Sequence, residues 1–190
     1  MPIKILALCG QSAAGKDTLL QEILKLNRPD THEIVSCTTR PPREGEVHGK
    51  NYYFLTNEEF ANKIENGEML EATVFRDWCY GTSLDSLNPE AINVGVFNVD
   101  GIDILMDNPK IDLYVVEVQA SAKTRLLRSL NREEYPDVDE IVRRYLADQK
   151  DFEHFYGWNS VFHNEGLIDL NEAARSILCF AERHWTETTN

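Results

Sequence analysis

The stretch IKILALCGQSAAGKDTLL, from Ile3 to Leu20, decides the fold of this chain. Mostly apolar residues lead into a loop of small ones, in which Gly10 and the pair Gly15–Lys16 have the spacing G-x-x-x-x-G-K. Small residues let successive backbone N–H groups turn toward a phosphate, and a helix starting near Gly15 directs its positive end at the same anion. Lys16 adds a mobile cation. The stretch therefore predicts a strand, a phosphate-binding loop and a helix.

This loop and the start of the helix are expected to hold the phosphates of ATP. The residues concerned are Gly10, Gln11, Ser12, Ala13, Ala14, Gly15, Lys16, Asp17 and Thr18. Asp17 stands where such loops usually have the Ser or Thr whose hydroxyl helps to hold Mg²⁺. An acid is favoured in a first helical turn by the amide dipoles, which alone would explain Asp17. The alternative is that its carboxylate contacts Mg²⁺, which prefers carboxylate and water oxygens.

Length and charge limit the partners of this protein. A chain of 190 residues can form one compact core with inserted lobes. Its 19 lysines and arginines face 32 acids, for a formal net charge of −13. Phosphate repulsion makes such a surface unsuited to nucleic acid, so no nucleic-acid partner is expected. An anionic ligand must instead meet a local group of arginines.

Four well-separated cysteines and the character of the first residues indicate the compartment. Cys9, Cys37, Cys79 and Cys179 fit no metal-binding spacing and are typical of a reducing environment. The first residues lack a cleavage region, and no apolar run approaches the roughly 20 residues of a membrane span. We expect a cytoplasmic protein without membrane contact.

Strand and helix patterns alternate along much of the chain, which is the signature of a parallel α/β sheet. After the first strand and helix, apolar runs of the buried parallel type occupy 93–99 and 112–118, and a short strand is expected at 160–163. Helical patterns occupy 102–106, 122–130 and 170–183. Two segments interrupt this alternation. The first has candidate strands at 33–37, 51–55 and 69–75 and a helix at 57–66, and the second, at 128–144, is polar and rich in charge.

Residues 36–54, which read SCTTRPPREGEVHGKNYYF, occupy the first interruption. They resemble the guanylate kinase signature S-x-T-T-R-x-P-R-x-G-E-x-x-G-x-x-Y-x-F at every fixed position. The resemblance continues at 68–71 (EMLE) and 80–82 (YGT), and becomes looser in the second half of the chain. It implies a three-layer P-loop NTPase core with a parallel sheet, formed by residues 1–35, 90–127 and 145–190. Residues 36–89 would form an inserted lobe that binds the nucleoside monophosphate, and residues 128–144 a short lid.

The resemblance also assigns the monophosphate site. Arg40 and Arg43 would hold the phosphate of GMP, for which planar guanidinium forks are suited. Glu71 would read guanine, because a carboxylate accepts hydrogen bonds and guanine offers two adjacent donors that adenine lacks. The full GMP-binding set implied by the family is Ser36, Arg40, Arg43, Tyr52, Glu71, Tyr80, Thr82 and Asp100.

The remaining assignments concern transfer and ATP. The family's lid arginines match Arg132 and Arg144 best, with Arg143 as an alternative, so the expected catalytic set is Lys16, Arg40, Arg43, Arg132 and Arg144. Asn164 would stand near the adenine of ATP. Asn98 replaces the first acid of a family segment that usually reads D-x-D-x-x-G, while Asp100 keeps the second acid.

The sequence thus predicts an enzyme that phosphorylates GMP, and dGMP as a second substrate, with ATP and Mg²⁺. Two alternatives stay open. One is a kinase for a broader range of (deoxy)nucleoside monophosphates, and the other is a guanylate-kinase-like module that binds phosphopeptides without catalysis. An intact Lys16 disfavours the binding module. The expected state is a monomer or homodimer.

Overall fold

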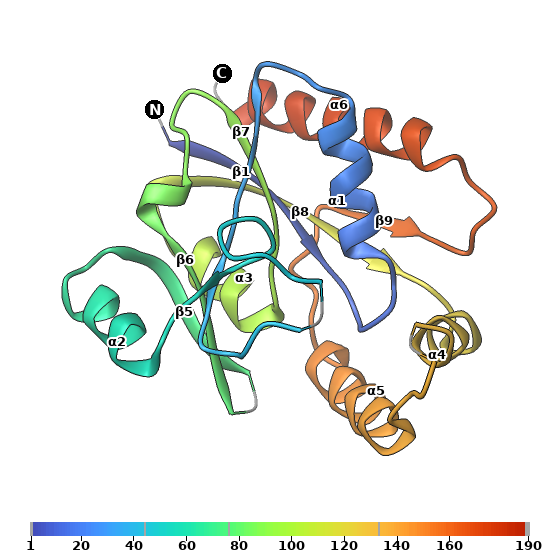
Figure 1. The fold of residues 1–190 in the computed structure, drawn as a ribbon. Helices are drawn as coiled ribbons and strands as arrows, with labels where there is room; N and C mark the ends of the chain where they lie inside the picture. The colour runs from blue at the N-terminus through green and yellow to red at the C-terminus, as the bar shows by residue number, and fades with distance from the viewer. Residues whose placement is uncertain (1, 44, 76, 133, 189–190) are drawn as a thin grey trace.

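A five-stranded parallel sheet, in the order β2-β7-β1-β8-β9, forms the centre of the computed structural model, which describes residues 2–43, 45–75, 77–132 and 134–188 (Figure 1). Its strands are β1 (Ile3–Cys9), β2 (Thr31–Glu33), β7 (Ile92–Val96), β8 (Ile111–Gln119) and β9 (Ser160–His163). Because β1 lies between β7 and β8, the loop that follows it leaves the middle of the sheet at the carboxyl ends of the strands. The predicted α/β class with a parallel sheet is confirmed.

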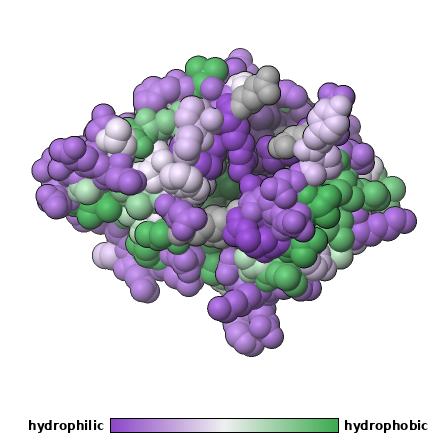
Figure 2. All heavy atoms as spheres, turned by 60° about the horizontal axis from the view of Figure 1, so that its bottom comes forward, coloured by the Kyte–Doolittle hydropathy of each residue, from purple (hydrophilic) through white to green (hydrophobic). Residues whose placement is uncertain are grey.

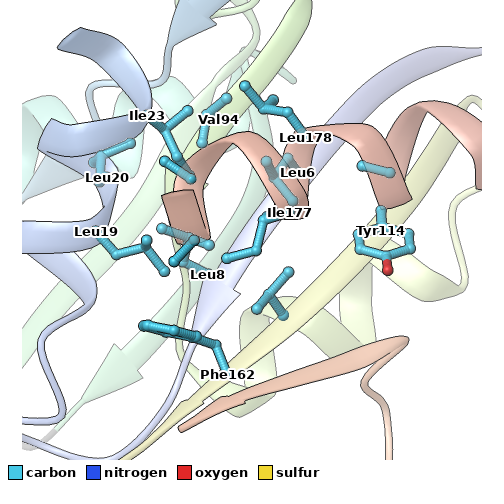
Figure 3. Close-up of a cluster of buried hydrophobic side chains, with 14 of the residues drawn as sticks. Leu6, Leu8, Leu19, Leu20, Ile23, Val94, Tyr114, Phe162, Ile177 and Leu178 are labelled. Atoms are coloured by element: carbon cyan, nitrogen blue, oxygen red, sulfur yellow. The ribbon is translucent and has the colours of Figure 1, made fainter. Parts of the chain in front are cut away.

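Helices cover both faces of this sheet. On one face α1 (Lys16–Lys25) and α6 (Leu170–Thr188) pack against the strands through an apolar cluster that includes Leu6, Leu19 and Leu178 (Figure 3). On the other face α3 (Val99–Met106) contributes Ile102 and Leu105 to a second cluster. The three layers follow from strands that are apolar on both faces and from helices that carry one apolar stripe each.

A second, mixed sheet belongs to the segment predicted to be an inserted lobe. Its strand order is β4-β3-β6-β5, with β3 (Cys37–Thr38), β4 (Tyr53–Phe54), β5 (Met69–Phe75) and β6 (Trp78–Ser83). Helix α2 (Asn57–Glu65) joins β4 to β5, and the short 3₁₀ helix η1 (Leu84–Ser86) follows β6. Thr56 caps α2 through a reciprocal pair of hydrogen bonds with Glu59.

The expected single strand at 33–37 is wrong, because the chain changes sheets within it. Residue Ile34 still donates its backbone N–H to Val94 in the central sheet, at 2.8 Å, and its side chain is buried there. Two residues later the carbonyl of Ser36 accepts from the N–H of Tyr53, at 2.9 Å, in the second sheet. The apolar pattern is continuous across this point, so periodicity alone could not locate the crossing.

The segment expected to be a lid overlaps two helices. Helix α4 (Ala122–Leu130) has the predicted bounds, whereas α5 (Val138–Phe152) was not predicted and begins inside the polar segment. The side chain of Asp137 caps α5 by accepting from the N–H of Glu140 at 3.0 Å. The proposed boundaries at residues 128 and 144 therefore fall inside helices, and the division into core, lobe and lid stays a prediction. Within the described ranges, no helix is both long and apolar enough to cross a membrane.

Candidate active site

The loop between β1 and α1 has a backbone that only certain residues can adopt. Gly10 and Gly15 have φ values of +142° and +102°, and Ala13 also lies in the left-handed region, with φ 60°. A Cβ atom on Gly10 would lie 2.2 Å from the carbonyl oxygen of Val118, and one on Gly15 would lie 2.3 Å from the side-chain nitrogen of Asn164. Both glycines of the motif are therefore required by close packing as well as by backbone conformation.

Two side chains from the neighbouring elements brace this loop. Asn164, after β9, donates from its side-chain amide to the carbonyl of Ala14 at 2.9 Å, and the residue is only 6% exposed. The guanidinium of Arg128, on α4, donates to the same carbonyl at 3.0 Å and to the backbone carbonyl of Asn164 at 3.0 Å. The structure thus places Asn164, which was expected near the adenine of ATP, against the backbone of the phosphate loop.

Lys16 lies over the loop and is surrounded by charged groups. Its Nζ donates to the carbonyls of Gly10 at 2.7 Å and Gln11 at 3.2 Å. Burial lowers the pKa of Lys16, and the nearby carboxylates of Asp17 and Asp148 oppose that shift. The amine therefore lies inside the loop, close to the place where the backbone N–H groups of the loop would bind a phosphate.

The first turn of α1 presents two side chains to solvent next to this amine. Asp17 and Thr18 are both exposed there, and Asp17 is the acid of that turn. Their oxygens are of the type that Mg²⁺ accepts. Among the residues that the structure describes, no cluster of three or more His, Cys, Asp or Glu side chains forms a metal site.

The arm that follows β3 is organised around Arg40. This guanidinium is almost fully buried, pairs with the carboxylate of Glu46 at 2.9 Å, and lies over the rings of Tyr52 and Phe54 at 5.4 and 5.7 Å. The other oxygen of Glu46 accepts from the backbone N–H of Arg43 at 2.7 Å. Glu46 therefore fixes both the side chain of Arg40 and the backbone of Arg43.

Four arginines from distant parts of the sequence meet near this arm. The pKa of Arg43 is lowered first by burial and then by the positive charges of Arg40, Arg144 and Arg132. Arg144, on α5, is held by Glu140 through a hydrogen bond of 2.7 Å, and Arg132 is exposed just beyond α4. The sequence predicted these four side chains as site residues, and the structure brings them into one electrostatic neighbourhood.

The arm also faces the phosphate loop. Burial raises the pKa of Tyr52 to about 12, and the next contribution is the negative charge of Asp17 at the start of α1. Figure 1 shows the loop after β1 and the arm after β3 on the same side of the central sheet. Figure 2 looks at this side, where mostly hydrophilic residues surround a hollow near the centre. Ser12 of the phosphate loop and Arg144 of α5 line the same small cavity, and Arg144 and Arg132 lie within electrostatic reach of Arg43 on the arm. We call this region, together with the phosphate loop, the polar recess.

The carboxylate of Glu71 lies at the junction of the lobe and the core. Glu71 is 7% exposed and pairs across β5 and β6 with Thr82, which is fully buried. Burial raises the pKa of Glu71 to about 7, and the polar groups of Thr82 partly oppose this shift. A Cβ on Gly101 would lie 3.3 Å from the Glu71 carboxylate, so the glycine leaves the room that this side chain needs.

Asn98 joins the same junction from the core. Its side-chain oxygen caps α3 by accepting from the N–H of Gly101 at 2.9 Å, and its amide donates to the hydroxyl of Thr73 on β5, also at 2.9 Å. An amide can make both bonds, whereas a carboxylate at this position could only accept. Asp100, predicted to be a ligand residue, is exposed on the first turn of α3.

The other predicted GMP residues also belong to the lobe. The rings of Tyr52 and Tyr80 meet edge to face with their centroids 6.1 Å apart. Ser36 is half-buried at the start of the second sheet. Tyr80 lies on β6, and Ser36 and Tyr52 immediately precede β3 and β4 of the sheet that carries Glu71.

Two residues of this region were missed by the sequence reasoning. Asp148, on α5, accepts from the backbone N–H of Ser12 at 2.6 Å and from its hydroxyl at 3.1 Å. Arg125, on α4, is buried with its guanidinium 3.7 Å from the same carboxylate. Arg125 and Arg128 are three residues apart on α4 and lie on the same side of that helix, so this spacing was a usable signal for Arg125. Asp148 left no such signal.

Comparisons with known proteins agree on one family. The family model described as guanylate kinase matches residues 3–179. The chain is 42% identical over 177 residues to a guanylate kinase of Geobacter metallireducens, covering 90% of this chain and 85% of the relative. It is 43% identical over 182 residues to one of Thermotoga maritima, covering 92% and 86%.

A solved structure supports the fold. The crystal structure of guanylate kinase from Anaplasma phagocytophilum aligns with a TM-score of 0.69 at 24% sequence identity, and the alignment covers 96% of this chain and 86% of that one. At this identity the likeness concerns the fold alone.

The burial of Glu71 predicts a pH dependence of stability. Its folded pKa of about 7 exceeds the ordinary value of 4.5, so the folded state holds this proton more tightly than the unfolded state. The stabilisation is fully present below about pH 4.5 and is lost as pH rises through 7. Between these limits the wild type should lose roughly 3 kcal/mol of unfolding free energy relative to Glu71→Gln, whose side chain does not titrate.

Urea unfolding of both proteins at a series of pH values measures this difference. Glu58→Gln, which changes an exposed acid on α2, is the control. Its free energy of unfolding should change with pH as that of the wild type does. If the unfolding free energy of Glu71→Gln also changes with pH as that of the wild type does, Glu71 ionises normally in the folded protein.

Proposed function

The chain belongs to the guanylate kinase family, and we propose that the residues of its polar recess carry out the reaction of that family, the transfer of a phosphoryl group from ATP to GMP. The observation that carries this proposal is the meeting of Arg40, Arg43, Arg132 and Arg144 opposite the phosphate loop. Arg40 and Arg144 already have carboxylate partners, Glu46 and Glu140, so the group is stable without a ligand. A transferring phosphoryl group would bring more acceptor oxygens and more negative charge to the same place.

The acceptor side holds GMP by its phosphate and by its base. Arg43 offers a planar fork beside the buried Arg40, and bidentate binding of phosphate needs this geometry. Glu71, as a carboxylate, accepts from the two adjacent N–H donors on guanine. Because Glu71 is buried, an unpaired negative charge there is unfavourable, and a base that brings two donors restores its partners. Adenine presents no such pair of donors.

The donor side holds ATP by the phosphate loop. The backbone N–H groups between Gly10 and Gly15 and the amine of Lys16 surround the phosphates. Arg132, just beyond α4, and Arg144, on α5, approach from the other side. No side-chain base is required, since positioning and charge neutralisation supply most of the catalysis. When bound with ATP, Mg²⁺ neutralises charge on the phosphates. Asp17 would hold it directly or through water, and Thr18 would keep its own contact with a phosphate.

The alternatives are less well supported. A module that only binds phosphopeptides has no use for a lysine held inside the phosphate loop, yet Lys16 is placed there by two hydrogen bonds. A kinase of broad specificity has no use for a buried carboxylate at the base position, yet Glu71 is buried.

The choice of monophosphate tests the proposal directly. A coupled assay with ATP, Mg²⁺ and a panel of GMP, dGMP, AMP, CMP and UMP should give GMP the highest kcat/KM. Sites built around a substrate's polar groups discriminate by roughly 10⁴-fold, so Glu71→Gln should remove most of the preference for GMP over AMP. Glu58→Gln serves as the exposed control on the same lobe. An unchanged GMP-to-AMP ratio in Glu71→Gln would exclude Glu71 from the base site.

The phosphate role of Arg43 gives a second prediction. Arg43→Lys keeps the charge and loses the fork, so the KM for GMP should rise roughly tenfold. Guanosine, which lacks the phosphate, should bind equally to both proteins in calorimetry. Arg175→Lys on α6, where the arginine is exposed, is the matched control. If guanosine binding weakens as much as GMP binding, the substitution acts on folding of the lobe.

The role of Asp17 is tested by a Mg²⁺ titration. If its carboxylate contacts the cation, Asp17→Asn should need more Mg²⁺ for half-maximal rate, and Asp17→Ser should be tolerated better than Asp17→Asn. Asp103→Asn, at an exposed position on α3, is the control. Superimposable titrations of the wild type and Asp17→Asn would leave Asp17 with only its favourable place in the first turn.

A further inference from the structure

The contact between Asp148 and the phosphate loop joins α5 to the loop. Both hydrogen-bond donors of Ser12 bind Asp148. The N–H donates to one carboxylate oxygen at 2.6 Å, and the hydroxyl donates to the other at 3.1 Å. The side chain of Asp148 is 8% exposed. This carboxylate is therefore a buried anion bound by the loop whose N–H groups are suited to phosphate.

Arg125 is the third donor near this carboxylate and is poorly satisfied. Its side chain is 6% exposed, its guanidinium lies 3.7 Å from Asp148, and it packs over the ring of Tyr145 at 4.9 Å. Within the described part of the chain, no acceptor reaches its buried Nε. A buried guanidinium with an unused donor is unfavourable unless a better acceptor arrives.

Both side chains lie next to the phosphate site. The pKa of Lys16 is affected by the negative charge of Asp148 and by the positive charge of Arg125. The residues around the small cavity beside Arg125 include Ser12 of the loop and Arg144 of α5, which was predicted to meet the transferring phosphate. An anion in the loop would therefore be close to Asp148 and to Arg125 at the same time.

From this geometry we infer that Asp148 acts as an internal substitute for a phosphate, which ATP displaces, and that Arg125 then becomes a further phosphate-binding residue. Without nucleotide, the carboxylate of Asp148 accepts both hydrogen bonds from Ser12 and neutralises the charge of Arg125. A phosphate group offers more acceptor oxygens than a carboxylate and carries more charge, so it can satisfy the free donor of Arg125 as well. Because Asp148 lies on α5 with Arg144, its release would couple loading of ATP to movement of that helix.

The inference rests on the proposed function, because it takes ATP as the ligand of the loop. It predicts that Asp148 competes with ATP. Only the fraction of molecules with a free Ser12 binds ATP, so the apparent Kd equals the intrinsic Kd divided by that fraction. Removing the competing charge-assisted contact in Asp148→Asn should therefore tighten ATP binding roughly tenfold. Arg125→Ala should weaken it, and the double variant should lose the gain of Asp148→Asn.

Calorimetry of ATP and of adenosine binding to each protein tests this inference. Adenosine lacks phosphates and should bind alike to the wild type and Asp148→Asn. Asp139→Asn, an exposed acid on the same helix, should match the wild type for both ligands. If Asp148→Asn does not fold, Asp148→Ser leaves the same loop groups open and replaces it.

The outcomes separate the inference from the proposed function. Unchanged or weaker ATP binding in Asp148→Asn, with normal binding in the wild type, overturns the inference and leaves the kinase assignment standing. Absence of ATP binding in the wild type overturns the proposed function itself. Tighter binding that persists in the double variant overturns the role given to Arg125.

Discussion

The architecture of this protein depends on the close fit of the phosphate loop against the carboxyl ends of the strands. Gly10 approaches the backbone of β8 so closely that a single Cβ would meet the carbonyl oxygen of Val118 at 2.2 Å. Gly15 meets Asn164 in the same way, and Asn164 and Arg128 both bind the carbonyl of Ala14. Strands β8 and β9 and helix α4 therefore hold in place a loop that is itself rich in small residues.

Positive charge gathers around this loop although the chain as a whole is acidic. A net charge of −13 repels nucleotides in general, yet the arginines of the arm, α4 and α5 gather where the transferred group would lie. Their own carboxylate partners keep this arrangement stable without nucleotide, as Glu46 does for Arg40 and Asp148 for Arg125. In the proposed reaction, a ligand with phosphate groups would exchange such internal pairs for better ones.

The lobe and the core meet through a set of polar groups around Glu71, the proposed guanine reader. Asn98, which follows β7, caps α3 and at the same time donates to Thr73 of the lobe. Gly101 leaves space for the side chain of Glu71. The polar link explains why an amide is accommodated at a position where the family usually has an acid, because only the amide donates and accepts together. The burial of Glu71 at this junction raises its pKa and makes its ionisation depend on what binds there.

The loop, the alternation of strands and helices, and the arm with its arginines could be predicted from the sequence, because each depends on local residue types at fixed spacing. Strand β9 and helix α4 have the predicted bounds for the same reason. The crossing between the two sheets near Ile34 could not be predicted, since the apolar pattern is the same in either sheet. Nor could the contact of Ser12 with Asp148, which joins residues 136 positions apart. Tertiary packing decided these features, because burial and pairing of polar groups depend on which distant segments meet, and periodicity carries no record of that.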